Sequence, residues 1–384
     1  MIPRILSTKI KQLRNQFPVL MLTGPRQSGK TTLLRAIYTD LPYATLEDPD
    51  TRALAIDDPR GFLSNFPHGG IFDEVQVAPV LFSYIQGIVD KNKIHFVLSG
   101  SQNFLLSEKI TQSLAGRTSI LKLLPFSFEE LKGTPYTADD WETMVYQGGY
   151  PPLYDRQISP TDFFPSYINT YIERDVRQIK NIENLNSFSS FLKLCAGRIG
   201  QVLNVQGLAH DVGISPNTAK AWLSVLSASY IIFFMEPHHR NFNKRLIKSP
   251  KMYFYDTGVA CSLLGIEKKE QLNSHFLKGG LFENYVVNEF VKHRTNQGKN
   301  PNISFWQSKD RKEIDLLIDR GDNMSAIEIK SGKTWSSSFF ENLKYWQKLS
   351  GTPSEQCYIV YGGDQNLNTS MGKFVGWRDL NNVF

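Results

Sequence analysis

Eight consecutive residues near the start of the chain have the types and spacing that bind a polyphosphate. They are Gly24-Pro25-Arg26-Gln27-Ser28-Gly29-Lys30-Thr31, which fit the pattern Gly-x-x-x-x-Gly-Lys-Ser/Thr at every fixed position. Backbone N–H groups and the dipole of a following helix would converge on the phosphates. Lys30 would reach the β- and γ-phosphates, and the Thr31 hydroxyl would be a ligand of Mg²⁺. We therefore expect this loop, with the adjoining Thr32, to bind ATP and Mg²⁺, and Lys30 to act in catalysis.

The residues around this loop predict the elements that such a site needs. Val19-Leu20-Met21-Leu22 precedes the loop as a buried strand would, and residues 32–37 have helical character. The competing interpretation is a glycine loop that opens a helix by chance. Such a loop would not be expected to have both the preceding strand and the following helix.

A short apolar strand over residues 69–72 ends in two carboxylates that complete the predicted hydrolysis site. Asp73 would hold Mg²⁺ through its water shell, and Glu74 would orient and polarise the attacking water. The alternative is that both acids lie on the surface and cap the next helix.

Polar residues after the next strand, and an arginine further on, are candidates for contact with the γ-phosphate. The strand that starts at Ile94 leads to Ser99, Ser101 and Asn103, of which we favour Ser101 as the sensor of that phosphate. Arg117 follows a small-residue turn, and its guanidinium could neutralise transition-state charge in its own subunit or in a neighbour. A solvated or salt-bridged surface arginine is the competing interpretation.

A second constellation lies near the C-terminus, on an expected hairpin over residues 312–330. Asp315 falls on its first strand, while Glu328 and Lys330 share one face of the second, because alternate side chains of a strand point the same way. This arrangement resembles that of the restriction-endonuclease-like nucleases. Asp315, Glu328 and Glu283 from a preceding helix would bind Mg²⁺, and Lys330 would promote hydroxide formation and stabilise the pentacovalent phosphate.

Cleavage is not the only interpretation of this hairpin. Polar residues on its solvent face can form a Glu-x-Lys pattern by chance. A fold of this type can also bind DNA or mediate dimerisation without cutting.

Residues 206–223 have the layout of a helix-turn-helix. Leu208 would pack the first helix, Gly213 would make the turn, and Ser215 would cap the second helix with Pro216 at its first position. Strands over 230–235 and 251–255 would complete a winged helix.

DNA binding through the second helix and a basic tip at residues 238–245 is the functional interpretation of this winged helix. A scaffold between domains is the alternative, because the helix carries little positive charge on its exposed face. That face offers Asn217, Lys220 and Ser224.

The composition narrows the class of protein. A chain of 384 residues is too long for one core, and a net charge of +6 permits DNA binding without demanding it. The three cysteines lie far apart without a Cys-x-x-Cys pair, which argues against a disulfide framework or a zinc site and favours a reducing compartment. The longest apolar run, residues 230–235, has the length of a strand. We therefore expect no membrane segment and a cytoplasmic location.

The order of the motifs resembles that of a known family. Gly24–Thr31 is followed by Leu-Glu-Asp-Pro at 46–49, Ile-Phe-Asp-Glu-Val-Gln at 71–76, Leu-Ser-Gly-Ser at 98–101, Leu-Ala-Gly-Arg at 114–117, Leu-Pro-Phe-Ser at 124–127 and Gly-Gly-Tyr-Pro at 148–151. This series is similar to that of a prokaryotic family of AAA+-type ATPases (AAA_14) whose C-terminal half carries a domain of unknown function, DUF4143. The resemblance extends over nearly the whole chain and implies an additional-strand P-loop core. Members of this family have no settled biological role.

Together these observations predict an α/β protein in four parts. We expect an AAA+-like P-loop NTPase domain at residues 1–140, a helical connector at 141–190, a winged helix at 191–265 and a restriction-endonuclease-like PD-(D/E)xK α/β domain at 266–384.

The expected function is ATP hydrolysis coupled to DNA binding, with a Mg²⁺-dependent nuclease-like domain at the C-terminus. A non-cleaving, ATP-dependent DNA-binding switch is one alternative, and a protein-remodelling or signalling ATPase is another. AAA+ ATPases often form rings, so a homo-oligomer is a further expectation, in which Arg117 would act on a neighbouring subunit.

Overall fold

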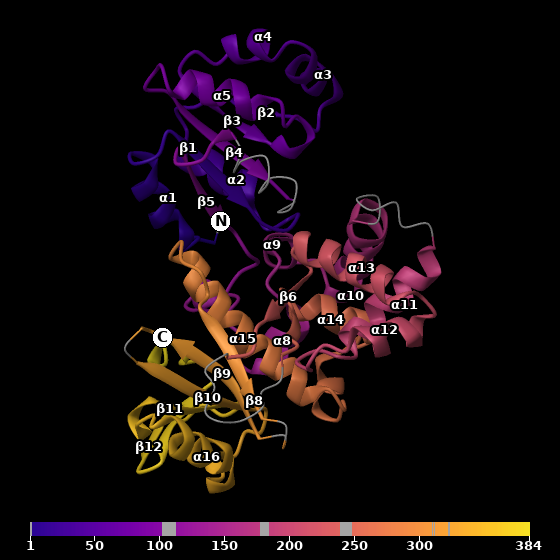
Figure 1. Ribbon diagram of the computed structural model, residues 1–384, viewed down its shortest axis with the longest axis vertical. Helices are drawn as coiled ribbons and strands as arrows, with labels where there is room; N and C mark the ends of the chain where they lie inside the picture. The colour runs from indigo at the N-terminus through magenta and orange to yellow at the C-terminus, as the bar shows by residue number, and fades with distance from the viewer. Residues whose placement is uncertain are drawn as a thin grey trace. The chain divides into compact units, whose positions relative to one another are not determined.

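The computed structural model (Figure 1) describes residues 2–101, 113–176, 184–238, 248–308, 310, 312–321 and 323–384. The chain forms two compact units. The first comprises Met1–Phe126, Ala228–Tyr230 and Arg294–Lys299, and the second comprises Ser127–Ser227, Ile231–His293 and Asn300–Phe384. Among the described helices, none combines the length and the apolar character needed to cross a membrane.

The first unit is built on a parallel five-stranded sheet with the order β2-β3-β4-β1-β5. Its strands are β1 (Val19–Thr23), β2 (Tyr43–Thr45), β3 (Gly69–Asp73), β4 (His95–Gly100) and β5 (Thr118–Lys122). β4 lies between β1 and β3, so that one strand separates the glycine loop from the strand that ends in acids. This is the parallel sheet with an additional strand that the resemblance to the AAA+-type family implies.

Helices cover both faces of this sheet, and all five residues of β1 are buried between them. Leu20 and Leu22 face one helical layer, while Val19 and Met21 face the other. The first layer holds α1 (Leu6–Arg14) and α2 (Lys30–Ile37). The second holds α3 (Pro49–Asp57), α4 (Pro59–Ser64) and α5 (Leu81–Val89), and a short 3-10 turn, η1 (Val75–Val77), follows β3.

The second unit begins with a mainly helical region. Its helices are α7 (Phe128–Leu131), α8 (Trp141–Gln147), α9 (Pro151–Asp155), α10 (Pro160–Tyr167), the π-helix η2 (Ile168–Val176), α11 (Leu185–Ala196), α12 (Val205–Val212), α13 (Pro216–Ala228), α14 (Thr257–Leu263) and η3 (Lys269–Asn273).

Within this region, α12 and α13 form the two predicted helices on either side of a tight turn. Gly213 makes that turn with a φ of 75°, which glycine adopts without strain. The Ser215 hydroxyl accepts a hydrogen bond from the Thr218 N–H at 3.0 Å and so caps α13. Trp222 of α13 packs edge-on against Phe188 of α11.

A pair of antiparallel strands, β6 (Ile232–Met235) and β7 (Lys251–Phe254), follows these helices. Val202, between α11 and α12, forms an antiparallel bridge with Lys251 on the free side of β7. The expected tip at residues 238–245 lies outside the described residues except for His238.

The C-terminal part of the second unit is a six-stranded mixed sheet with the order β12-β13-β11-β10-β9-β8. β8, β9 and β10 are antiparallel neighbours, whereas β10, β11 and β13 run parallel. Leu343 and Trp346 of α16 pack on Leu317 and Ala326 of the sheet. The elements in order are α15 (Lys278–Asn296), β8 (Ile303–Gln307), β9 (Glu313–Asp319), β10 (Met324–Lys330), η4 (Ser337–Phe340), α16 (Glu341–Ser350), η5 (Ser354–Gln356), β11 (Cys357–Tyr361), β12 (Leu367–Thr369), β13 (Gly372–Gly376) and η6 (Leu380–Asn382).

Candidate functional site

The glycine loop leaves β1 and enters α2 through backbone conformations that favour glycine. Gly24 has a φ of 149°, and a Cβ atom at this position would lie 2.1 Å from the Leu123 carbonyl oxygen. Gly29, with a φ of 90°, immediately precedes the first residue of α2, and Gln27 also has a positive φ of 61°. These conformations bend the loop over the carboxyl ends of the strands. The N-terminus of α2 then faces the space enclosed by the loop, where a phosphate would bind.

Lys30 lies inside this loop. Its ammonium donates hydrogen bonds to the carbonyl oxygens of Gly24 at 3.0 Å and Pro25 at 2.9 Å. Burial lowers the pKa of Lys30, because the charged form loses solvation. The Lys30 ammonium is therefore held at the loop by two backbone carbonyl groups.

The remaining loop residues have different surroundings. Ser28 is fully buried, and its hydroxyl has no hydrogen-bond partner among the described residues, while its carbonyl accepts a bond from Arg4 at 2.8 Å. Arg26 lies 3.5 Å from the Glu47 carboxylate. Thr32 is exposed in the first turn of α2. The contact between Arg4 and the loop was not predicted, because Arg4 lies outside the loop motif.

Thr31 and Asp73, the two predicted residues of the Mg²⁺ site, are in direct contact. The Thr31 hydroxyl donates to Asp73 Oδ2 at 2.5 Å, and the Tyr43 hydroxyl donates to the same oxygen at 3.1 Å. Ser99, at the end of β4, donates to the other carboxylate oxygen of Asp73. The parallel strands bring these residues to one edge, and a hydroxyl with a carboxylate is a donor set that suits Mg²⁺.

Glu74 follows Asp73 in a left-handed conformation with a φ of 54°. Its Oε2 atom accepts hydrogen bonds from the Ser101 hydroxyl at 2.9 Å and from the Gln76 side-chain amide. Ser101, which we favoured as the sensor of the γ-phosphate, therefore contacts the predicted water-polarising carboxylate. Gln76 was not predicted, although it stands two residues after Glu74. Asn103 lies outside the described residues.

Arg117 lies near the amino-terminal ends of the strands, whereas the glycine loop lies at their carboxyl ends. Its carbonyl accepts a hydrogen bond from the N–H of Val19, the first residue of β1, whereas the loop follows the last residue of β1. A strand of this length spans roughly 16 Å. The guanidinium forms a two-point ion pair with Asp90 at 2.5 and 2.9 Å, which lowers the pKa of the Asp90 carboxyl. Arg117 is thus not brought to the loop within its own chain.

The predicted C-terminal residues do come together. Asp315 on β9 accepts a hydrogen bond from the Ile329 N–H at 2.7 Å and lies 3.8 Å from the Lys330 ammonium. Lys330 also donates to the buried Glu328 at 2.6 Å. β9 and β10 are antiparallel neighbours, which is why these three side chains meet.

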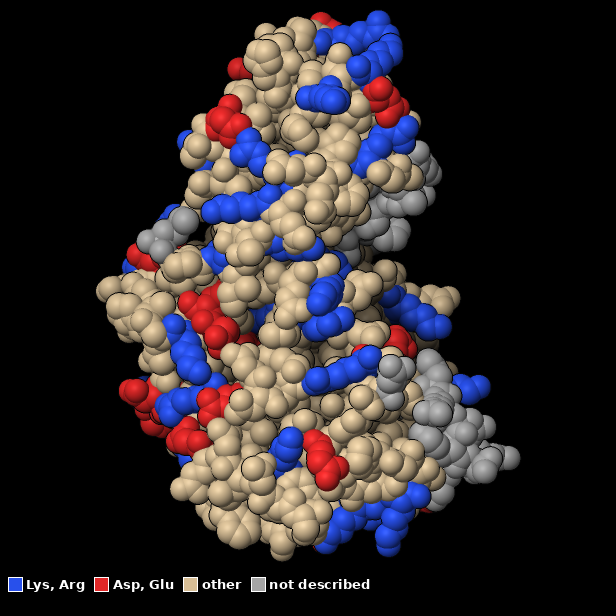
Figure 2. All heavy atoms as spheres, turned by 90° about the vertical axis from the view of Figure 1, so that its left-hand side faces the viewer, with Lys and Arg blue, Asp and Glu red and all other residues tan. Residues whose placement is uncertain are grey.

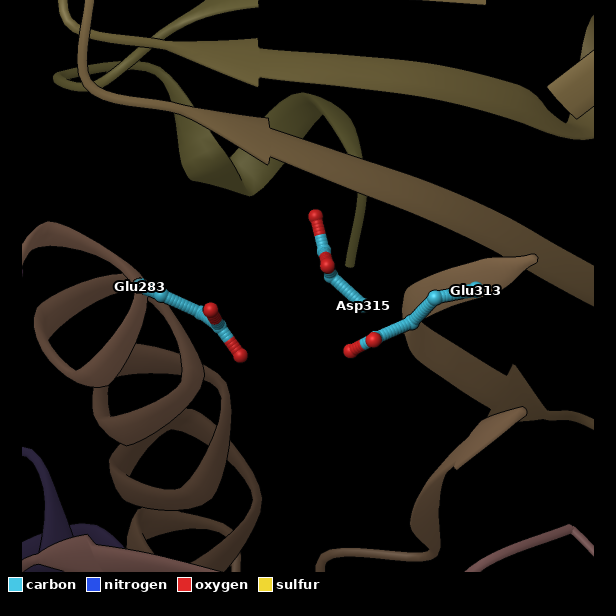
Figure 3. A group of neighbouring side chains, drawn as sticks. All are labelled: Glu283, Glu313 and Asp315. Atoms are coloured by element: carbon cyan, nitrogen blue, oxygen red, sulfur yellow. The ribbon is translucent and has the colours of Figure 1, made fainter. Parts of the chain in front are cut away.

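Glu283 joins Asp315 from a different element. Figure 3 shows Glu283 on α15 and the pair Glu313 and Asp315 on β9 with their carboxylates turned toward one another. One oxygen from each of the three lies within 4.8 Å of the others. Glu328, a predicted metal ligand, is not part of this group, since its carboxylate contacts Lys330 and lies 3.5 Å from the Asn342 side-chain amide. Glu313 was not predicted, although its two-residue spacing from Asp315 on a strand is the signal for a shared face.

Burial perturbs the acids of this C-terminal group. Loss of solvation raises the pKa of Glu283 to about 7 and that of Glu328 to about 8. For Lys330, loss of solvation acts in the opposite direction, but Asp315 and Glu328 outweigh it and raise the pKa of the ammonium. The group is therefore a partly buried set of carboxylates held by lysine cations.

The three residues expected on the outer face of α13 are exposed: Asn217, Lys220 and Ser224. His238 lies at the described end of the expected tip, where its backbone N–H donates to the Phe305 carbonyl of β8 at 2.6 Å.

The strand order and the loop define the class of the first unit. An AAA-type P-loop ATPase domain has three such features. They are a parallel sheet with an additional strand, a glycine loop that opens a helix after β1, and an Asp-Glu pair at the end of β3, with β4 between the two strands.

Comparison with protein families agrees with this class. Residues 16–132 match a family described as "AAA domain" (AAA_14), and residues 278–380 match "Domain of unknown function (DUF4143)". The chain therefore has the predicted AAA_14/DUF4143 architecture. Between them, residues 138–270 match "Domain of unknown function (DUF8612)".

Related sequences and structures were also found. An uncharacterized protein of Mycobacterium tuberculosis is 27% identical over 86% of this chain and 74% of its own. An uncharacterized protein of Methanocaldococcus jannaschii is 24% identical over 84% of this chain and 76% of its own. Among solved structures, a Walker-type ATPase of Pyrococcus abyssi aligns with a TM-score of 0.45 and 17% identity, over 67% of this chain and 94% of its own.

Proposed function

We propose that this chain binds ATP with Mg²⁺ and hydrolyses it at the carboxyl edge of the five-stranded sheet. The observation that carries the proposal is the contact between Thr31 and Asp73 at 2.5 Å, with Glu74 as the next residue. A hydroxyl from the loop helix and a carboxylate from β3 meet where Mg²⁺ would be held.

Each residue has a role that follows from its position. The loop N–H groups and Lys30 bind the phosphates, which requires Lys30 to exchange its carbonyl partners for phosphate oxygens. Thr31 would be a ligand of Mg²⁺ and Asp73 would hold the ion through its water shell, and the ion would supply positive charge against the phosphates. Glu74 orients and polarises water, and its bonds to Ser101 and Gln76 fix the direction of its carboxylate.

The substitution Lys30→Ala tests this proposal. We expect steady-state ATP hydrolysis to fall by more than about 100-fold, because a cation aimed at the transferring phosphate is lost. Lys11→Ala, which removes an exposed lysine of α1, is the matched control and should hydrolyse ATP at the wild-type rate. Normal turnover by Lys30→Ala would rule out this site as the site of hydrolysis.

We further propose that ATP turnover is coupled to DNA, with a nuclease-like site in the second unit. Two observations support this. The turn between α12 and α13, the pair β6–β7 and the Val202 bridge follow the order of elements in a winged helix. In the C-terminal part, Asp315, Glu328 and Lys330 meet on a sheet entered from α15.

Charge alone does not identify the DNA-binding surface. On the face that Figure 2 shows, Lys and Arg side chains are interspersed with Asp and Glu. Affinity for DNA should therefore depend on local contacts, and it should fall as the salt concentration rises.

Cleavage is tested with Asp315→Ala on duplex, branched and single-stranded DNA in Mg²⁺ or Mn²⁺. We expect loss of nicking without loss of ATPase activity, whereas the control Asp319→Ala, an exposed acid at the far end of the same strand, should still cut. Binding without any cleavage by the wild type would favour the DNA-binding switch. Failure to bind nucleic acid even at low salt would favour a protein-remodelling or signalling ATPase.

A further inference from the structure

Lys251 of β7 reaches into the carboxylate group of the C-terminal sheet. Its side chain is only 4% exposed, and the ammonium lies 2.9 Å from Glu283 Oε1 and also contacts Glu313. These are two of the three acids whose oxygens lie within 4.8 Å of one another. A cation from outside the predicted site is therefore already bound among its acids.

The strand pairing explains how Lys251 arrives there. β7 pairs with β6, and the chain just after β6 forms a bridge from Pro237 to Phe305 of β8, the edge strand of the six-stranded sheet. The Lys251 ammonium lies 5.5 Å from the centre of the Phe305 ring. Tyr253, two residues further along β7, donates its hydroxyl to Glu283 at 2.7 Å. Two alternate residues on one face of this strand thus hold the same carboxylate.

These contacts use the oxygens that a metal ion would need. Glu283 Oε1 accepts from both Lys251 and Tyr253, while Glu313 accepts from Lys251 through one oxygen and from Gln307 at 2.6 Å through the other. Hydrogen bonds between charged groups are strong, and breaking a buried ion pair leaves uncompensated charge. Mg²⁺ and Mn²⁺ would have to replace these bonds by direct or water-mediated coordination.

We propose that the Lys251 ammonium is the resident cation of the Glu283, Glu313 and Asp315 group, and that a divalent ion enters only by displacing it. This inference rests on the proposed nuclease-like function of this domain, for which the three acids would hold the metal ion. It makes Lys251, which lies outside the DUF4143 match, a component of that site. Metal occupancy then depends on the position of β7 relative to β8 and β9.

The inference is tested by measuring Mn²⁺ binding to the full chain, with free Mn²⁺ followed by electron paramagnetic resonance. Lys251→Met removes the charge and keeps much of the volume, and we expect it to bind Mn²⁺ at least about tenfold more tightly than the wild type, because charge-assisted bonds no longer compete. The gain should vanish in the double variant Lys251→Met/Asp315→Ala. Lys251→Gln is a second neutral variant, for use if the first does not fold.

Lys292→Met is the matched control. Lys292 is also buried on α15 and pairs with Glu289 at 3.1 Å, outside the carboxylate group, so its loss should leave Mn²⁺ affinity at the wild-type level. Equal Mn²⁺ binding by the wild type and both neutral variants would overturn the role of Lys251 while leaving the metal site intact. No Mn²⁺ binding by any of these proteins would overturn both.

Discussion

At the scale of single residues, the first unit holds Glu74, its predicted water-polarising carboxylate, in a defined orientation. Glu74 accepts hydrogen bonds from Ser101 and Gln76, and Asp73 accepts bonds from Thr31, Tyr43 and Ser99. Carboxylates with this many donors are already positioned, so little reorganisation should be needed when the nucleotide binds.

The contact between Ser101 and Glu74 leads to a prediction about Ser101→Ala. If the hydroxyl orients Glu74, its loss should lower kcat by about tenfold, the cost of one hydrogen bond to a charged group, and leave KM for ATP nearly unchanged. Steady-state kinetics over a range of ATP concentrations measure this split. A raised KM with an unchanged kcat would instead assign Ser101 to phosphate binding.

At the scale of elements, Asp256 joins two segments of the second unit. It precedes α14, and its carboxylate accepts hydrogen bonds from the N–H groups of Gly149 at 2.7 Å and Gly258 at 2.9 Å. Gly148 has a φ of 68°, and a Cβ atom there would lie 2.2 Å from Asp256 Oδ1. This contact explains why the first residue of the Gly-Gly-Tyr-Pro motif is a glycine.

The buried carboxyl of Asp256 should make stability depend on pH. Burial raises the pKa of this carboxyl to about 6, well above the usual range for aspartate. The folded state therefore holds this proton more tightly than the unfolded state, and the contribution to the free energy of unfolding falls as pH rises from about 4 to about 6, by on the order of 3 kcal/mol.

Urea unfolding of the wild type and Asp256→Asn at several pH values isolates this contribution. The variant should gain stability relative to the wild type across that pH range, because it has no proton to release. A difference in unfolding free energy that stays constant with pH would show that Asp256 does not titrate in this way.

Elements with strong local signals could be predicted from the sequence, whereas contacts between distant elements could not. The apolar run at residues 19–22 and the loop glycines predicted the P-loop core. The alternation in β9 and β10 predicted that Asp315 meets Lys330. Lys251 was missed because its contact with Glu313 depends on how β7 and β9 are brought together in three dimensions. Glu313 did have a local signal, its position two residues before Asp315 on the same strand. Ser101 was placed at the correct strand end, but its partner Glu74 was not foreseen.

At the scale of the whole molecule, Arg117 bears on the question of assembly. It lies at the edge of the sheet away from the glycine loop and pairs with Asp90. If it neutralises transition-state charge, it must act on the site of another subunit. We predict that Arg117→Ala and Lys30→Ala are each inactive alone but regain part of the activity when mixed, since a mixed assembly can contain sites with an intact Lys30 and a neighbouring Arg117.

Sedimentation of the same samples would report whether mixed assemblies form. Full ATPase activity of Arg117→Ala alone would assign the arginine to a surface ion pair with Asp90, which contributes little to stability when exposed.

At the carboxyl edge of the first sheet, ATP hydrolysis is proposed to depend on Glu74. The most direct measurement is the turnover rate of Glu74→Gln together with its affinity for ATP. We predict that kcat falls by about 100- to 1000-fold while the dissociation constant for ATP stays within about twofold of the wild type, because the amide keeps the shape but cannot polarise water. Turnover at the wild-type rate by Glu74→Gln would show that Glu74 is not the water-polarising carboxylate.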